Sequence, residues 1–410
     1  MRGLFGAIAG GLERKAADVS ALTWAKLWGE ESAVKSGVSV SIDSAMRVST
    51  VLACARVISE GVAQLPFKLY REGKDGSKTL AKDHDLYDVL HRRPNPWMTS
   101  FQFREALTLH AVLTGNGYAF KNRGSGGVIK EMIPLVPGNV QCTQGRDWEM
   151  EYRLVGDSRV YTSEEIFHLR GPSWSGYLGM DAVQMAREAI GLAIATEETH
   201  ARLHANGAQP GGVLSIKGAL DEAGRARLMA GWKQFQEGLN NKFRTAVIDQ
   251  EAEWKPLAMT GVDSQHIETR KFQIEEICRN LRVFPQMVMH SDKTSTFASA
   301  EQFFLAHVVH TLLPWVERWE QSVSCFILDE RELDIVPKMN VTALLRGTAA
   351  DRASYFSRAL GAGGAPAWMT QDEVRQLDEL NPMGGDAAVL PKPTNVPGAV
   401  PAKPKDENDA

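Results

Sequence analysis

Two pairs of histidines are the residues whose spacing could support metal chemistry in this chain. His200 and His204 lie four residues apart on a predicted helix, so both imidazoles could face one zinc ion. Glu197 and Glu198 stand one turn earlier, and a metalloprotease helix instead carries a glutamate directly after its first histidine, where Ala201 is found here. The pattern therefore favours two partly exposed polar side chains on a solvent or subunit face over a metal site.

The second pair, His307 and His310, lies three residues apart on an otherwise apolar predicted helix, which favours histidines in a core or an interface. Glycine-rich residues 124–127 are typical of a hairpin turn, with no Lys-Ser/Thr following to hold a phosphate. The sequence has no Gly-x-Ser-x-Gly elbow and no cysteine in a reactive motif. Catalytic groups can be assembled from distant segments, so these absences are weak arguments. They nevertheless favour a protein that is not an enzyme and that needs no metal or cofactor.

Between residues 268 and 320 the sequence predicts two amphipathic helices joined by a polar loop. The first helix has apolar residues at i, i+3, i+4 and i+7, namely Ile274, Ile277, Cys278 and Leu281. The second has a wide apolar face with Pro314 inside it, formed by Phe304, Val308, Leu312, Trp315 and Trp319. Polar connections as long as residues 289–297 are usually functional or disordered. Because helices hold both ends, this loop suits contact with a moving or variable partner better than it suits catalysis.

The composition is that of an ordinary globular protein with two or three domains. The chain has 410 residues, of which 43% are hydrophobic and 23% charged, and its formal net charge is −4. It therefore lacks the bulk basicity of many nucleic-acid-binding proteins. The four cysteines have no metal-site or redox spacing, so we expect reduced, small core residues in a cytosolic protein; they are Cys54, Cys142, Cys278 and Cys325. No run approaches the roughly 18 apolar residues that a membrane span needs, so no membrane partner is expected.

The first half of the chain alternates helical and strand patterns, which predicts an α+β fold. A helix is expected from Asp43 to Gly61 and another from Asp85 to His91. Thr99 and Gln102 form a capping box that opens a third helix, which Gly115 should stop. Strands are expected at residues 66–71, 118–122, 128–135, 140–143, 149–155 and 165–169. Trp174, in a glycine-bounded loop, is the tryptophan best placed for an interface.

The second half places a small α/β insert between two long helices. The first long helix should run from Asp181 to Ala205, and the chain returns along the helix that includes residue 268. The insert is expected to contain a strand at 213–216, a helix at 221–238, and a hairpin of strands 245–248 and 253–257. Further helices are expected at 349–360 and from 370 to 380, where Thr370 and Glu373 form a capping box. Such an out-and-back protrusion usually packs against copies of itself.

Six segments, taken in order, resemble the portal proteins of long-tailed double-stranded DNA bacteriophages. The strongest is residues 83–104, and the others are residues 115–119, 186–193, 206–214, 268–273 and 311–320. The resemblance extends from about residue 40 to residue 385. It implies a non-enzymatic ring, usually of twelve copies, which surrounds the DNA channel at one vertex of the capsid.

The resemblance also implies a role for each segment, except for the arm before residue 40 and the tail beyond 385, which match poorly. We expect an N-terminal arm (1–40), an α+β wing (41–180), a stem helix (181–209), a clip (210–259), a second stem helix (260–283), a tunnel loop (284–300), a long kinked helix that returns to the wing (301–340), a crown (341–384) and a disordered tail rich in proline and alanine (385–410). The implied partners are the terminase large subunit of the packaging motor, the major capsid protein, a head-tail adaptor and double-stranded DNA bound without sequence preference. The implied location is the virion, after assembly in the host cytoplasm.

Two groups of polar residues are predicted to serve the channel. Tunnel-loop residues should approach DNA, namely His290, Ser291, Asp292, Lys293, Thr294 and Ser295. Twelve copies at −4 each would carry a formal charge of about −48, which suits a channel that lets DNA slide, because many phosphate contacts to lysine and arginine would hold it. The second stem helix offers basic side chains that either face the channel or bridge to a neighbouring subunit, with the bridge favoured, namely Arg270, Lys271, Arg279 and Arg282.

Two alternatives stay open at this stage. The same protein could belong to a gene-transfer agent or a defective prophage particle, which the sequence does not distinguish from a phage. A function of a different class, an intracellular metal-dependent hydrolase, would depend on His200 and His204 and would fail when either is replaced.

Overall fold

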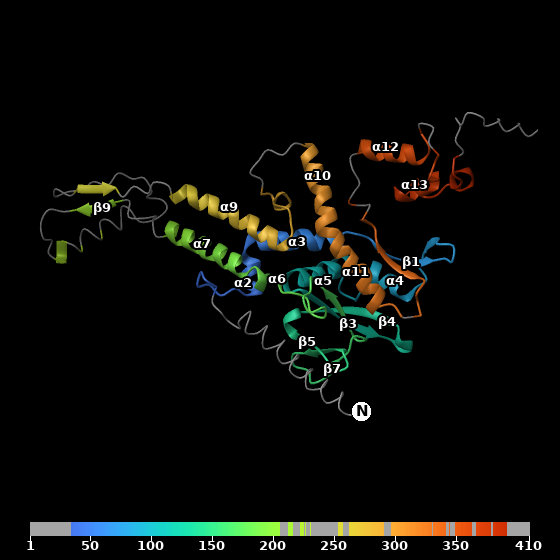
Figure 1. Ribbon diagram of the computed structural model, residues 1–410, viewed down its shortest axis with the longest axis horizontal. Coiled ribbons are helices and arrows are strands. Elements are labelled where there is room, and N and C mark those ends of the chain that lie inside the picture. Colours follow the sequence, from blue (N-terminus) through green and yellow to red (C-terminus); the bar gives the residue numbers. More distant parts are fainter. Residues whose placement is uncertain are drawn as a thin grey trace, which may run out of the picture. The chain divides into compact units, whose positions relative to one another are not determined.

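The computed structural model divides the chain into two compact units, Met1–Asn340 and Val341–Ala410 (Figure 1). The described residues are 34–205, 212–215, 222–224, 226, 230, 253–256, 262–290, 297–329, 331–341, 344, 349–362, 366–378 and 380–391. Helix and strand are mixed throughout, which confirms the predicted α+β class. No helix in these ranges is long and apolar enough to cross a membrane.

Antiparallel sheets and the helices beside them form most of the first unit. One sheet has the order β11-β1-β2, a second β4-β3-β8 and a third β5-β6-β7, while β9 and β10 pair with each other. The strands are β1 (Phe67–Glu72), β2 (Lys78–Leu80), β3 (Asn116–Arg123), β4 (Ile129–Leu135), β5 (Val140–Gln144), β6 (Met150–Leu154), β7 (Val160–Tyr161), β8 (Ile166–Arg170), β9 (Gly212–Ser215), β10 (Glu253–Pro256) and β11 (Ile335–Met339). The helices are α2 (Ile42–Arg47), α3 (Ser49–Ala63), α4 (Asp85–His91), α5 (Ser100–Thr114), α6 (Ala182–Met185), α7 (Arg187–Ala205), α9 (Val262–Leu281), α10 (Phe297–His307) and α11 (Leu313–Phe326). Short helical turns complete the unit at η1 (Ser125–Gly127), η2 (Pro137–Asn139), η4 (Pro285–Val288) and η5 (Val308–Leu312).

Trp319 lies at the centre of this unit's core. Its indole is fully buried and its ring centroid lies 6.3 Å from those of Phe67 and Phe103, both in edge-on arrangements. A third ring, Phe167 of β8, lies 5.8 Å away. The indole Nε1 donates a 2.9 Å hydrogen bond to the buried Thr108 hydroxyl on α5. One side chain of α11 thus joins two sheets and a helix, with its polar atom satisfied.

Arg104 on α5 holds the ends of two other helices. Its guanidinium is buried and donates to the carbonyl of Ala63, the last residue of α3, at 2.7 Å, and to that of Leu90 in α4 at 3.1 Å. The final carbonyls of a helix lack partners within the helix and carry the negative end of its dipole, so a cation there is favourable. Burial lowers the pKa of Arg104 to about 10, which still leaves it charged at neutral pH.

The loop that precedes α6 and α7 is fixed by contacts at the end of α5. Gly115 ends the helix, as predicted, with a left-handed φ of 77°, and a Cβ there would lie 2.4 Å from the carbonyl oxygen of Met180. The next residue, Asn116, accepts a hydrogen bond from the Gly179 amide at 2.8 Å through its side-chain oxygen. The same oxygen accepts from Nε2 of His168 at 3.0 Å, and the His168 Nδ1 faces the Tyr152 hydroxyl at 3.3 Å. These contacts hold the loop that leads into α6.

The second unit is small and helical in the residues described. It contains α12 (Ala349–Ala359), α13 (Gln371–Leu377) and the turn η7 (Gly385–Ala388). The predicted capping box is present, because the Thr370 hydroxyl accepts from the Glu373 amide and the Glu373 carboxylate accepts from the Thr370 amide. Asp372 accepts from the amides of Met383 and Gly384, which folds the following segment back onto α13.

Several details differ from the sequence prediction. The first helix is interrupted at Val48, whose extended backbone separates α2 from α3. Strand β10 pairs with β9, whereas the hairpin was predicted between 253–257 and 245–248, and residues 245–248 lie outside the described ranges. The predicted helix at 221–238 also lies largely outside them. All four cysteines are free, but only Cys54 and Cys278 are buried core residues, with their sulfurs 3.6 Å apart.

We predict that Arg104→Met lowers the free energy of unfolding by roughly 3 kcal/mol, because two buried carbonyls lose their donor. Urea denaturation of the purified protein measures this difference. The matched control is Arg92→Met, which removes an exposed arginine paired with Asp88 one turn away. The control should unfold like the wild type, and similar losses in both variants would contradict the role given to Arg104.

We also predict that the neutral His168 makes the fold sensitive to acid. Burial, with a smaller contribution from Arg170, lowers the pKa of His168 to about 3. Since the unfolded chain takes up this proton near pH 6.5, stability is full above that pH and is lost between 6.5 and about 3. The loss from this residue between pH 7 and pH 5 is about 2 kcal/mol.

The test of this effect is denaturation of His168→Gln at both pH values. The variant should lose about 2 kcal/mol less than the wild type over this interval. The control is Arg92→Met, which leaves every histidine in place and should keep the wild-type pH dependence. An unchanged pH dependence in His168→Gln would count against the assignment.

Candidate functional site

Helices α7 and α9 form an antiparallel pair that leads out to the insert and back (Figure 1). They are tied together by Gln273, whose buried side-chain amide donates to the Thr196 hydroxyl at 3.2 Å. On the facing side of α9, Ile277 and Cys278 are also buried. Cys278 lies against Cys54 of α3, with the two sulfurs 3.6 Å apart, so the predicted apolar stripe faces inward and α9 packs on α3 as well as on α7.

The basic residues predicted to act together on α9 do not form one stripe. Arg270 and Arg279 are nine residues apart, which places them about 180° apart around a helix. Arg270 lines a small cavity with Glu197 and His200, between α3, α7 and α9. Arg279 forms an ion pair with Glu276 of its own helix. Lys271 also lies on α9, and the roles predicted for these residues at a channel or interface stay predictions.

Arg282 lies just beyond α9, in a backbone conformation that favours glycine. Its φ is +56°, and the Val283 amide bonds to the Cys278 carbonyl at 2.9 Å, which is the hydrogen bond of a Schellman end. The Arg282 carbonyl accepts from the buried Thr311 hydroxyl at 2.7 Å. The end of the stem is thereby attached to the turn between α10 and α11.

That turn is a π-helical segment, η5, in which the Leu313 amide bonds to the Val308 carbonyl. It precedes Pro314, whose ring lacks an N–H and would clash with the carbonyl of His310 in a regular helix. Widening the helix by one residue accommodates the proline, so the kink has a local cause. The two histidines diverge here, because His307 is buried, with its pKa lowered by burial, while His310 is exposed.

The predicted tunnel loop, residues 284–300, is described at residues 284–290 and at residues 297–300, which begin α10. Met289 has a left-handed backbone with φ of +60° and is 98% exposed, and the His290 amide bonds to the Pro285 carbonyl at 3.0 Å. Ser291, Asp292, Lys293, Thr294 and Ser295 lie outside the described residues. Their approach to DNA stays a prediction. Trp174, the predicted interface tryptophan, is 78% exposed.

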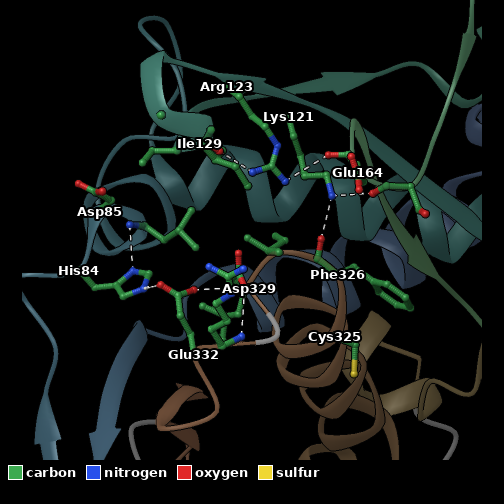
Figure 2. Close-up of a pocket in the computed structure, with 18 of the residues that line it drawn as sticks. His84, Asp85, Lys121, Arg123, Ile129, Glu164, Cys325, Phe326, Asp329 and Glu332 are labelled. Carbon is green, nitrogen blue, oxygen red and sulfur yellow. Dashed lines mark hydrogen bonds and ion pairs between the residues drawn. The ribbon is translucent and has the colours of Figure 1, made fainter.

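A large cavity among the described residues was missed by sequence reasoning. It has a volume of about 900 Å³ and lies between β3, the start of α4 and the end of α11 (Figure 2). Within it Lys121 donates to the carbonyls of Ser163 and Phe326 at 2.7 and 2.8 Å, and burial lowers the pKa of Lys121 to about 8. A lysine directly after the apolar residues Tyr118, Ala119 and Phe120 was the one available signal for this buried group.

The charged groups around this cavity satisfy one another. His84 caps α4 by accepting from the Leu86 amide with Nδ1, which leaves Nε2 to donate to Glu332 at 2.9 Å. Arg123 donates to the carbonyls of Gly127 and Glu164. Figure 2 shows these contacts converging on the cavity wall. Side chains bound in this way hold the wall together, and we assign them no reaction.

The metal site considered for His200 and His204 has no geometric support. Within the described ranges, no group of three or more histidine, cysteine, aspartate or glutamate side chains is placed to hold a metal ion. His200 lines the small cavity beside Arg270, and the position of the His204 side chain is outside what the structure describes.

Comparison with known proteins identifies the family. The family model for phage portal proteins matches residues 49–379. The chain belongs to the phage portal protein family. Its relatives include the portal protein of Enterobacteria phage HK97, which is 29% identical over 357 residues, covering 86% of this chain and 83% of the relative. The probable portal protein of Streptomyces phage phiC31 is 27% identical over 362 residues, covering 85% and 78%.

Solved structures of portal type share this fold. A chain from the virion of a native gene transfer agent particle superposes with a TM-score of 0.60 at 22% identity, covering 87% of this chain and 95% of that one. A portal protein of the HK97 family from Corynebacterium diphtheriae gives a TM-score of 0.53 at 16% identity, covering 75% and 98%. These likenesses and the family match leave the metal-hydrolase alternative without support.

Proposed function

We propose that twelve copies of this chain assemble head to tail into a ring at one capsid vertex, and that the genome enters and leaves through its centre. The observation that carries the proposal is the family match over residues 49–379. It is supported by the shared fold with a chain from the neck of a native gene transfer agent particle, computed with C12 symmetry, which covers 84% of this chain. A head-to-tail interface that closes on itself gives such a ring. The proposed function involves no catalysis.

Each proposed segment has a physical reason. The sheets and helices of residues 41–180 provide a rigid wing around the buried Trp319 core. The stem pair buries the sides where its helices face each other and where α9 meets α3, so its exposed sides are available to neighbouring copies. The clip at 210–259 follows from the position of the insert at the far end of the stem. Residues 284–300 are proposed as the tunnel loop, 301–340 as the kinked helix and its return, and 341–384 as the crown.

The partners follow from the same assignment. We propose that the clip binds the terminase large subunit during packaging and a head-tail adaptor afterwards, and that the wing faces the major capsid protein. The particle is a phage virion, assembled in the host cytoplasm. A gene transfer agent is the second candidate, favoured by the fold match to the virion of such a particle.

The ring is tested by the native mass of the purified protein, followed by negative-stain imaging of the same sample. Twelve copies of the 45.1 kDa chain predict a species of about 541 kDa with a central hole. Imaging distinguishes a closed ring from an irregular aggregate of similar mass. A monomer or dimer that persists at high concentration and at several salt concentrations would count against the proposal.

Deletion of residues 289–296 tests the tunnel loop. We expect rings of unchanged mass but reduced packaging and retention of DNA in assembled particles, because the loop ends are anchored separately by η4 and α10. A control with residues 291–296 replaced by glycine and serine at equal length separates the role of loop length from that of the side chains. Normal packaging and retention after the deletion would show that the loop does not act on DNA.

A further inference from the structure

A cationic cavity lies where the stem joins the wing. It has a volume of about 380 Å³ and is lined by parts of α6, α9, η5 and α11. Figure 1 shows the ends of these elements close together. Three arginines, Arg279, Arg282 and Arg318, and one histidine, His310, line it, and none of the residues that line it is an aspartate or a glutamate.

Among the residues that the structure describes, two of these three arginines have no acidic partner. Arg279 is neutralised by Glu276 one turn earlier on α9. For Arg282 and Arg318, the structure places no carboxylate within ion-pair distance among the residues it describes. The pKa of Arg318 is lowered first by burial and then by the positive charge of Arg282, so the two guanidiniums repel each other. An anion between them would relieve both the repulsion and the loss of solvation.

Arg318 is held in place for such a contact. Its guanidinium lies over the Trp315 ring, 5.2 Å from the centroid, and donates to the Pro314 carbonyl at 3.1 Å. A guanidinium has five N–H donors, so this arrangement leaves others for a ligand. The stacking also reduces the freedom that the side chain would lose on binding.

Arg282 occupies its position against the preference of the backbone. The left-handed conformation at the end of α9 is most often taken by glycine, and an arginine there is strained. The hydrogen bond from Thr311 to its carbonyl fixes this residue from the other side of the cavity. A strained residue held by its surroundings suggests that its side chain has a function.

We propose that Arg282 and Arg318 form a binding site for a carboxylate of a second copy of this chain. The inference rests on the proposed ring, in which copies lie side by side. The lining also includes apolar side chains, namely Pro172, Met180 and the 38% exposed Met185. Arg282 is exposed and Arg318 is half-buried, and arginines beside apolar residues are typical of protein interfaces, whereas surfaces that bind DNA phosphates are polar and strongly basic. The chain has 50 acidic against 46 basic residues, so carboxylates are available on its copies.

Arg282→Gly is the decisive variant, because it separates folding from binding. Glycine suits the left-handed backbone, so the thermal unfolding midpoint of the unassembled chain should be unchanged or higher. Loss of the guanidinium should nevertheless raise the concentration needed for half-assembly by at least tenfold, measured by sedimentation velocity of the full chain. A variant that assembles like the wild type would overturn the proposal.

Arg318→Gln and Arg318→Lys form a matched pair at the second residue. Glutamine should weaken assembly as Arg282→Gly does, and lysine should restore part of it by keeping the charge. The control Arg56→Gln removes an exposed arginine that is paired with Glu60 on α3, and it should assemble normally. Equal behaviour of all three variants would contradict a specific anion site.

The outcomes also separate this inference from the ring itself. If the wild-type chain forms no ring, the proposed function fails first. If the wild type forms rings and the two cavity variants form them equally well, only the carboxylate site is wrong. If the variants form normal rings but lose DNA retention in particles, the anion is a DNA phosphate, and the contact to a second copy is refuted.

Discussion

The buried indole of Trp319 is the contact on which the rest of the first unit depends. It brings together Phe67 of β1, Phe103 of α5 and Phe167 of β8, residues that are far apart in the sequence. A large aromatic at such a junction contributes much of the buried apolar area, and its hydrogen bond to Thr108 fixes its orientation. Because Trp319 lies on α11, this helix packs directly against β1, α5 and β8. The strand that follows it, β11, then pairs with β1.

Around that core, buried charged side chains form hydrogen bonds that fix the positions of helices and of β11. Arg104 holds the ends of α3 and α4, and Lys121 donates to the carbonyl of Phe326, the last residue of α11. Glu320 accepts from the Met339 amide at 2.8 Å and also pairs with Lys338, which fixes β11. In each case a charge is buried where backbone groups of the opposite polarity converge, so its loss of water is offset by hydrogen bonds. Helix ends fixed in this way make the wing a rigid base for the stem.

Local signals in the sequence were enough to predict most helices and strands. The capping boxes at Thr99 and Thr370 and the glycine at 115 act within a few residues, so their positions could be inferred directly. The pairing of β1 with β11 could not be inferred, because it depends on contacts between residues about 270 positions apart. The π-helical turn was also missed, although Pro314 indicated that the helix would be disturbed there.

The predicted site residues show the same limit. The burial of Ile277 and Cys278 on α9 follows from helical periodicity and was inferred correctly, whereas the hydrogen bond from Gln273 to α7 was not predicted. Arg282 lies beyond α9 because of the way this helix ends. It lines the same cavity as Arg318 because the π turn sets the direction of α11. Arg318 was therefore absent from the predicted set. The periodicity of a single helix cannot predict a group of charges that is contributed by two separate helical segments.

The attachment between Arg282 and Thr311 explains how a loop could act on DNA without loosening the wing. The loop leaves the stem through η4, and α10 returns to η5, so Arg282 and Thr311 lie on the two sides of the excursion. The hydrogen bond between Thr311 and Arg282 joins the two ends of this segment. The Schellman end of α9 and the widened turn before Pro314 both lie next to this hydrogen bond. The strained backbone at Arg282 and the π turn thus belong to one contact, the hydrogen bond from Thr311 to the Arg282 carbonyl, which joins the end of α9 to the kink before α11.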